Sequence, residues 1–493
     1  ERLTVKSGIA VRSEVKHGAI LNGAGLGNGT MIIGNAVSDV VIDGFHITKH
    51  TGAGIQLGGG GKNYYIINNM ISDQIHERVQ GHAIVVYGMR WQDGIFPMLT
   101  ENVVVDGNTI RNVQTGVREA FNEALTLAWN IDGCKITNNV LDGTSMIGID
   151  LIGKNHDDQW ISPAMRGSGT PANPRRCIIA NNTVLRAGTH GMDVAIYLDG
   201  AKDVLIEKNY MEGHRGHGIV ASVEEHVFVT ERVIIRNNVS VDGTRNMTPT
   251  ATGQHSMSRH VRMAHNTVAV TDHDASGSGG RAISFYSGED IKVLNNVFSI
   301  VKSSENVLME NYNDWAFGYT PILDGNCWNP AVGGFLQYKG VFYSNVADYQ
   351  RGSGQDANAI AGDPQFVNIG ARDFHLREGS PCRDSGVPLT TVASSGSGTA
   401  ITLEDARWFT DGYDYWDNDD IQIGNQRAKV VKVDYNTNIV TLDRSLTWTA
   451  GTAVGYLHVG GPDRGAFEHG DIDTEPPPES DSPPMPPVLR TFK

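Results

Sequence analysis

Apolar and polar residues alternate in one short pattern that recurs between residues 30 and 302. The pattern reads V-x-I-x-N-N-x-h, where h is an apolar residue, and its copies start 24 to 43 residues apart. The nine copies begin at Val40, Tyr64, Val103, Cys134, Cys177, Val204, Val233, Val261 and Ile291. The alternation predicts a β-strand in each copy, and a repeat of this length is typical of a solenoid.

Two columns of like residues emerge when the copies are stacked. One is an inward apolar column: Ile42, Ile66, Val105, Ile136, Ile179, Ile206, Ile235, Met263 and Val293. The other holds eight asparagines: Asn69, Asn108, Asn139, Asn182, Asn209, Asn238, Asn266 and Asn296. A stacked amide can donate to one neighbouring coil and accept from the other. The columns therefore predict an all-β right-handed parallel β-helix, and the asparagine column resembles the asparagine ladders of such proteins.

A second predicted strand in most coils has an outward column that forms one floor of a groove. Its members are Gln56, Val85, Thr126, Asp150, Tyr197, Val220 and Ser284. The longest coils place extra loops at 87–100 and 153–174, after this second strand. Insertions on one face of a solenoid often build its binding site, so we expect a cleft over coils two to six.

Three segments after residue 302 resemble the closing segments of bacterial secreted right-handed β-helix proteins. They are AGDPQFVN (361–368), DFHLREGSPCRDSG (373–386) and GPDRGAFE (461–468). Those proteins form a loose superfamily of polysaccharide lyases and glycoside hydrolases with the pectin-lyase-like fold. The resemblance implies the fold and a polysaccharide substrate, but no particular family.

The repeat pattern and the local composition together divide the chain into four parts. We expect a β-helix over 1–389, a small inserted β-module over 390–460, a closing segment at 461–470 and a Pro-rich tail at 471–493. For the module, packing is favoured over ligand binding. Cys134 and Cys177 share one column on neighbouring coils, where they could pair, although packing in an apolar column is the more common role.

Charge and hydropathy exclude two classes of partner. The net charge of -15, from 55 acidic and 40 basic residues, argues against nucleic acid, which is bound through lysine and arginine. No stretch is apolar enough to insert into a membrane. Glu1 begins directly in strand-like sequence, so any secretion signal is expected to be missing from the printed chain. The oligomeric state stays open.

The candidate catalytic residues lie where the outward column contains an aspartate. Asp150 and Tyr197 are expected on adjacent coils, and Asp199 lies two residues further along. The two backbones would then be roughly 8 Å apart, which falls in the range of carboxylate separations in inverting glycosidases. The alternative is that these outward carboxylates are only solvated. The loop after Asp150 adds Lys154 and His156 as further candidate catalytic groups.

The same loops supply candidate binding residues for sugar and for a metal. Sugar binding is predicted for Trp91, Trp129 and Trp160, whose rings match apolar sugar faces, and for Arg90 and Glu224. Asp157, Asp158 and Glu225, with Asp199 and Glu224, could hold Ca²⁺ through oxygen ligands. Calcium bound there would support lyase chemistry, with Lys154, His156 or Tyr197 removing the proton.

Two other signals are weaker. DVAIYLDG (193–200) and RGHGIVAS (215–222) look like two coils of polygalacturonase-type hydrolases, with Asp193 and His217 at matching positions. However, Met192 stands where the first aspartate should be, so we interpret the match as shared coil geometry. His82, Glu119, Glu123 and His214 flank the opposite groove edge, where capping or solvated residues are the usual occupants.

The sequence thus predicts an extracellular or cell-surface enzyme that cleaves glycosidic bonds of a polysaccharide bound along the groove. Hydrolysis is narrowly favoured because the floor is rich in carboxylates and poor in arginine, whereas a metal-free lyase needs cations. The alternatives are a Ca²⁺-dependent lyase or epimerase acting on a uronic-acid polymer, and a non-catalytic glycan-binding or structural β-helix.

Overall fold

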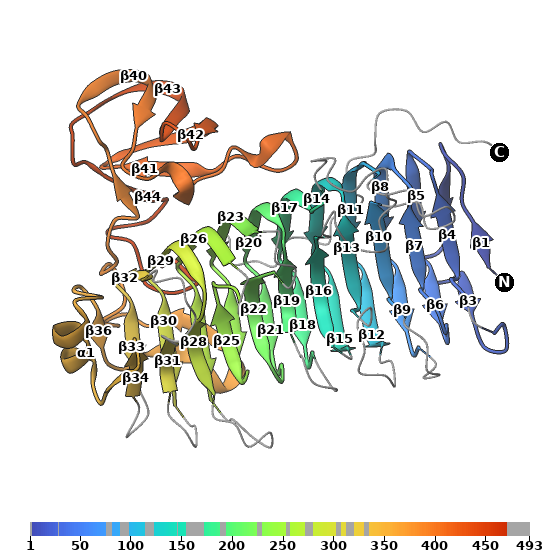
Figure 1. Cartoon of the computed structure of the whole chain (residues 1–493), viewed down its shortest axis with the longest axis horizontal. Coiled ribbons are helices and arrows are strands. Elements are labelled where there is room, and N and C mark those ends of the chain that lie inside the picture. The colour runs from blue at the N-terminus through green and yellow to red at the C-terminus, as the bar shows by residue number, and fades with distance from the viewer. Residues whose placement is uncertain are drawn as a thin grey trace.

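The chain winds into a long solenoid in which each turn adds one strand to each of three sheets (Figure 1). This computed structural model describes residues 2–27, 29–74, 81–88, 98–113, 123–144, 146–153, 172–187, 194–223, 229–252, 257–271, 280–301, 307–311, 320–329 and 335–470. Neighbouring coils pair in parallel, for example β16 (Ile147–Ile152) with β19 (Val194–Asp199). The prediction of an all-β parallel architecture is confirmed.

We call the three sheets A, B and C. Sheet A contains β1 (Leu3–Thr4), β4 (Ile32–Asn35), β7 (Ile55–Gly58), β10 (Ile84–Gly88), β13 (Leu125–Trp129), β16, β19, β22 (His217–Ser222), β25 (Arg245–Thr248), β28 (Arg281–Phe285), β31 (Val307–Asn311), β34 (Phe335–Tyr338) and β35 (Val341–Tyr343). Sheet B contains β2 (Ala10–Arg12), β5 (Val40–Asp43), β8 (Gly61–Ile67), β11 (Thr100–Asp106), β14 (Ile131–Thr137), β17 (Arg175–Ala180), β20 (Lys202–Glu207), β23 (Val229–Arg236), β26 (Met257–Ala264), β29 (Gly288–Leu294) and β32 (Ile322–Asp324). Sheet C contains β3 (Ile20–Asn22), β6 (His46–Thr48), β9 (Met70–Ser72), β12 (Thr109–Val113), β15 (Val140–Thr144), β18 (Thr183–Leu185), β21 (Tyr210–Glu212), β24 (Val239–Val241), β27 (Thr267–Val270), β30 (Val297–Ile300), β33 (Cys327–Asn329) and β36 (Ile360–Ala361).

The solenoid extends on both sides of the nine pattern copies at 30–302. It starts at β1 and continues through β36, followed by the antiparallel pair β37 (Phe366–Asn368) and β38 (Asp373–Leu376). The coils after residue 302 depart from the repeated pattern, since the next copy begins with Pro321 where the other copies begin with an apolar residue, and carries Asp-Gly-Asn at 324–326. A helix, α1 (Val346–Ser353), then packs close to β34 and β35.

The predicted asparagine ladder is present and runs at the corner between sheets B and C. Asn139 shows the pattern: its backbone N–H and its Nδ2 both donate to Oδ1 of Asn182, one coil further on, at 3.0 Å. Its Nδ2 also donates to the carbonyl of Val105 on the preceding coil. The ladder residues are buried, so each coil satisfies polar groups of its neighbours that water cannot reach.

The residue before each ladder asparagine explains the repeated Asn-Asn pair. Asn138, Asn181 and Asn237 have φ between 54° and 56°, in the left-handed region. Gly325 occupies the same position at φ 65°, one residue before Asn326. Asparagine and glycine tolerate this conformation better than other residues, so the first member of the pair turns the chain while the second enters the ladder.

The ladder ends in an aspartate. Asn326, a ninth rung that the sequence pattern missed, donates its backbone N–H to Oδ1 of Asp356 at 3.1 Å. Trp328 Nε1 donates to the other carboxylate oxygen at 2.6 Å. An ionised carboxylate only accepts hydrogen bonds, so Asp356 completes the last amide without requiring an acceptor beyond it. Arg464, buried nearby in the closing segment, donates to the carbonyl of Asn326.

Two disulfides join parts of the described structure. Cys134 bonds to Cys177 across neighbouring coils, with their Cα atoms 4.5 Å apart. Cys327 bonds to Cys382 and ties the last coils to the segment that follows β38. The interpretation of Cys134 and Cys177 as packing residues is therefore corrected: the parallel register brings their side chains close enough to bond.

Residues 390–456 form a small antiparallel sheet of their own. Its order is β39 (Thr390–Thr391), β44 (Ala453–Tyr456), β41 (Asp420–Ile423), β42 (Gln426–Asp434), β43 (Ile439–Trp448) and β40 (Gly396–Thr402). A bridge between Val392 and Leu403 links the two edge strands. A core of its own, centred on Trp408 and Phe409, fills this module.

The module packs on the outer face of sheet B (Figure 1). Asp419 pairs with Arg236 at 2.7 Å, and Asp405 pairs with both Arg262 and Lys292. Trp416 contacts an apolar patch on the same face. These buried ion pairs hold the module at one position along the solenoid, and its contacts lie on sheet B.

We expect loss of one ladder amide to destabilise the fold strongly. Asn182→Ala removes the acceptor of two buried donors on Asn139, which should lower the free energy of unfolding by about 2–5 kcal/mol in urea titrations. Asn181→Gly is the matched control, since glycine tolerates φ 55° and should change that free energy by less than about 1 kcal/mol. Equal effects of the two changes would contradict the role of the ladder.

The end of the ladder should make stability depend on pH. Burial raises the pKa of Asp356 from its ordinary value of 3.8 to about 6. Between these values the folded state binds more protons than the unfolded state, so stability falls as pH rises, by about 1.4 kcal/mol per pH unit at most. Asp356→Asn should remove this slope between pH 4 and pH 6, measured by urea unfolding at each pH. An unchanged slope would contradict the assignment.

Candidate functional site

The predicted groove floor lies on the outer face of sheet A. Asp150 on β16 is in register with Tyr197 on β19, which confirms that the two share a column on adjacent coils. Asp199 lies two residues beyond Tyr197, on the same face, opposite Ile152. Asp150 is 2% exposed and Asp199 8%, so both carboxylates are in a largely water-free environment.

A second group of polar residues lies at the start of the same face, two coils earlier. His82 Nδ1 is 2.9 Å from the backbone carbonyl of Glu123 and 3.5 Å from its carboxylate. Its other ring nitrogen, Nε2, is 3.4 Å from the hydroxyl of Tyr87. From the sequence, His82 and Glu123 could each be catalytic, but capping or solvated roles were favoured because the sequence does not place the tyrosine beside them.

These contacts fix the tautomer of His82. A carbonyl oxygen only accepts, so the proton lies on Nδ1 and Nε2 is free to accept from Tyr87 when the ring is neutral. Burial lowers the pKa of His82, and the nearby Glu123 carboxylate opposes part of that shift. Burial likewise raises the pKa of Tyr87. A neutral imidazole facing a neutral phenol can accept and return a proton.

Trp129 supports this group instead of facing the groove. Its ring stacks on Tyr87 with centroids 4.9 Å apart, and the residue is 4% exposed. The prediction of Trp129 as a platform for sugar rings is therefore corrected, because one ring face is taken by Tyr87 and little of the residue is accessible.

The floor continues past the aspartates into a basic row. His217 on β22 is in register with Arg245 on β25, which is in register with Arg281 on β28. All three are partly exposed. Arg245 and Arg281 belong to coils beyond the section that the sequence assigned to the arginine-poor cleft floor, so the same face of the sheet becomes basic further along the solenoid.

Most other predicted site residues lie outside the described part of the chain. This applies to Lys154 and His156, to Trp91, Trp160, Arg90 and Glu224, and to Asp157, Asp158 and Glu225. Of the predicted site, the structure brings together Asp150, Tyr197 and Asp199. The calcium site, for which only Asp199 is described, stays a prediction.

Comparison with known sequences agrees with this geometry. Residues 128–298 match the family described as "Right handed beta helix region". Those residues span the coils from the end of β13 to β30, and their strands pair in parallel throughout the described part. The chain is a right-handed parallel β-helix protein. No curated protein sequence matches it.

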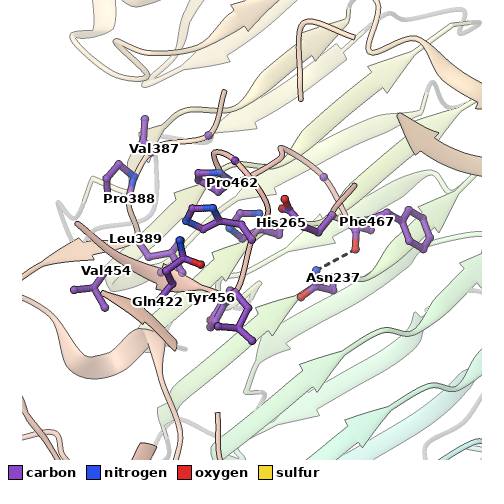
Figure 2. Close-up of a pocket in the computed structure, with 18 of the residues that line it drawn as sticks. Asn237, His265, Val387, Pro388, Leu389, Gln422, Val454, Tyr456, Pro462 and Phe467 are labelled. Carbon is purple, nitrogen blue, oxygen red and sulfur yellow. Dashed lines mark hydrogen bonds between the residues drawn. The ribbon is translucent and has the colours of Figure 1, made fainter. Parts of the chain in front are cut away.

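A pocket of the β-helix protein lies away from sheet A (Figure 2). This cavity of about 800 Å³ lies between the module, the closing segment and the ladder corner, with Tyr456, Phe467 and His265 among its lining residues. His265 Nδ1 donates to the backbone carbonyl of Asp463 at 2.8 Å, and Tyr456 packs beneath Arg236. None of the predicted site residues lines this pocket, which is where three chain segments of the β-helix protein meet.

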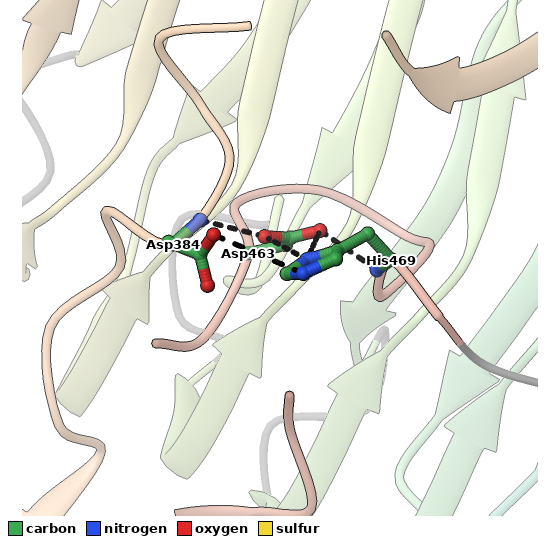
Figure 3. Close-up of side chains that lie close together, drawn as sticks. All are labelled: Asp384, Asp463 and His469. Carbon is green, nitrogen blue, oxygen red and sulfur yellow. Dashed lines mark hydrogen bonds and ion pairs between the residues drawn. The ribbon is translucent and has the colours of Figure 1, made fainter. Parts of the chain in front are cut away.

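Among the described residues, one group could hold a metal: Asp384, Asp463 and His469 (Figure 3). The carboxylate of Asp463 already accepts the backbone N–H of Asp384 at 2.7 Å and that of His469 at 2.8 Å. Asp384 in turn accepts the N–H of Gly461. We interpret the group as a clasp that fastens the closing segment, since its oxygens are occupied by backbone donors.

A chelator should therefore leave this clasp intact. We expect EDTA to leave the melting temperature unchanged, whereas Asp463→Asn should lower the free energy of unfolding by about 1–3 kcal/mol through weakened backbone contacts. Asp417→Asn, on an exposed aspartate of the module, is the matched control and should have little effect. A melting temperature that falls with EDTA and recovers with added metal would contradict the clasp.

Proposed function

We propose that this β-helix protein is a carbohydrate-active enzyme that hydrolyses glycosidic bonds of a polysaccharide bound along the outer face of sheet A. The supporting observation is the placement of two carboxylates on that face. The register of Asp150 with Tyr197 puts Asp199 one coil and two residues away. From strand geometry the two aspartate backbones are roughly 8 Å apart.

This spacing leaves room for a water molecule, as in inverting glycosidases. One aspartic acid donates its proton to the glycosidic oxygen as the bond from that oxygen to the anomeric carbon breaks. The other carboxylate takes a proton from water, whose oxygen forms the new bond to the anomeric carbon. Tyr197 shares a column with Asp150 and precedes Asp199 by two residues, which suits it to orient a sugar hydroxyl.

The pair His82 and Tyr87 favours a second candidate, cleavage by elimination. A neutral imidazole can remove the proton next to a uronate carboxylate, after which the electrons form a carbon–carbon double bond and the glycosidic oxygen leaves with a proton from Tyr87. The arginines are several strands away from this pair. The uronate charge at His82 would then need another cation, such as the predicted Ca²⁺, and an epimerase would use the same first step.

We also propose that the protein acts outside the cell or at its surface. Both cysteine pairs of the described structure are bonded, and disulfides persist in oxidising compartments. Among the described residues, no helix is long and apolar enough to cross a membrane.

Substitution of the aspartates tests the hydrolase. We expect Asp150→Asn and Asp199→Asn each to lower kcat on a cleavable polysaccharide by about 10²–10⁴-fold, measured by release of reducing ends. Asp142→Asn, on sheet C, is the matched control and should retain full activity. Tyr87→Phe should leave hydrolysis nearly unchanged.

The products distinguish the candidates. New reducing ends without ultraviolet absorbance from a double bond indicate hydrolysis, whereas absorbance that disappears in Tyr87→Phe indicates elimination. Full activity in both aspartate variants would refute the hydrolase assignment. Glycan binding with no cleavage of any polysaccharide would instead support a non-catalytic binding protein.

A further inference from the structure

The basic row on sheet A has no role in the chemistry proposed above. It consists of His217, Arg245 and Arg281, which occupy matching positions on β22, β25 and β28. Adjacent strands are about 4.8 Å apart, so the two guanidinium groups start from neighbouring backbones. Two guanidinium groups on adjacent strands, with His217 on the strand before them, give this part of the face a local concentration of hydrogen-bond donors and positive charge.

Hydroxyl groups extend the row along the same face. Thr248 lies three residues after Arg245 on β25, and its Oγ1 is 2.8 Å from Nδ1 of His217. Ser284 lies three residues after Arg281 on β28 and is fully buried. Its Oγ makes no hydrogen bond within the described part of the chain. Guanidinium groups with nearby hydroxyls match the oxygens of a carboxylate or a sulfate.

The charge of the row is carried by the arginines. Burial lowers the pKa of His217 to about 3, and the positive charges of Arg245, His214 and Arg281 act in the same direction. The imidazole is therefore neutral near pH 7 and contributes hydrogen bonds. A guanidinium carries five N–H donors, so each arginine can bind a ligand oxygen while also contacting other groups of the protein.

The row is separated from the aspartates along the solenoid axis. β25 is three strands beyond β16, which corresponds to about 14 Å, and Asp150 shares its column with Tyr197, Val220 and Thr248. A polysaccharide lying along the axis on sheet A would thus place one sugar between the aspartates and another, a few units away, against the arginines.

We propose that His217, Arg245 and Arg281 form a subsite for an acidic sugar, so that the substrate is a polysaccharide bearing carboxylate or sulfate groups. This inference rests on the proposed function in taking a polysaccharide as the ligand of sheet A. The net charge of -15 repels such a chain at long range, which makes this local basic row decisive for its binding.

Binding measurements with the full chain test the subsite. The probes are polygalacturonate as a carboxylate chain, dextran sulfate as a sulfate chain, and dextran as a neutral chain, each in affinity electrophoresis at rising NaCl. We expect one charged chain to bind at least tenfold more tightly than dextran, with affinity that falls as salt rises. The better of the two charged chains identifies the acidic group.

Substitutions assign the binding to the row. Arg245→Gln and Arg281→Gln should each weaken binding of the charged chain about tenfold, while Arg245→Lys should lose less because it keeps the charge. Arg259→Gln removes an arginine from sheet B and is the matched control, expected to bind normally. Melting curves verify that each variant is folded.

The outcomes separate this proposal from the hydrolase. Equal binding of dextran, no binding of any probe, or unchanged affinity in folded Arg245→Gln and Arg281→Gln would overturn the acidic-sugar subsite. Asp142→Asn, on sheet C, should bind the charged chain like the wild type. If the charged chain binds through the arginines and is not cleaved, the subsite stands and the hydrolase fails.

Discussion

The whole structure depends on hydrogen bonds between consecutive coils. The hydrogen bonds of the buried asparagines have the strictest geometric requirements. A buried amide with no partner would destabilise the fold by an amount comparable to much of the stability of a small domain. Each ladder asparagine finds its partners only if the next coil is at the right height and rotation. A shift of one residue would leave donors of two coils unsatisfied, so the ladder fixes the register of every strand near it.

Because the register is fixed, the sequence determines which side chains lie together on each face of the solenoid. Residues at equivalent positions of the repeat become neighbours, as Asp150 and Tyr197 do, although the chain separates them by a long insertion. The outer face of sheet A therefore changes along the solenoid from a histidine–tyrosine pair, through carboxylates, to arginines. On the outer face of sheet B, the fixed register likewise places arginines on neighbouring strands. There they bind the aspartates of the module.

Much of this could be predicted from the sequence, because the fold repeats and each repeat is short. Nine copies of one pattern were enough to identify the inward column, the ladder and the pairing of Asp150 with Tyr197. Asn326 was missed because Pro321 stands where the other copies begin with an apolar residue; the preceding glycine is shared with Asn108, which follows Gly107 in the same turn. The group around His82 was missed for another reason: Tyr87 reaches back to it across a strand, and no repeat pattern encodes such a contact. The arginines were overlooked because the groove was assumed to end with the long loops. Substrate and reaction depend on loop residues that carry no repeating pattern, so the sequence left them open.

The docked module sets a limit that a plain solenoid does not have. Solenoids can gain or lose coils during evolution, since each unit contacts only its neighbours. Here Tyr413 contacts Asp203 on β20, while Asp405 holds Lys292 on β29, so one rigid body is anchored at points three coils apart. Insertion or deletion of a coil between those points would pull at least one anchor away from its partner. The module thus fixes the number of coils from β20 to β29, and related proteins that keep this module should vary in coil number only outside that stretch.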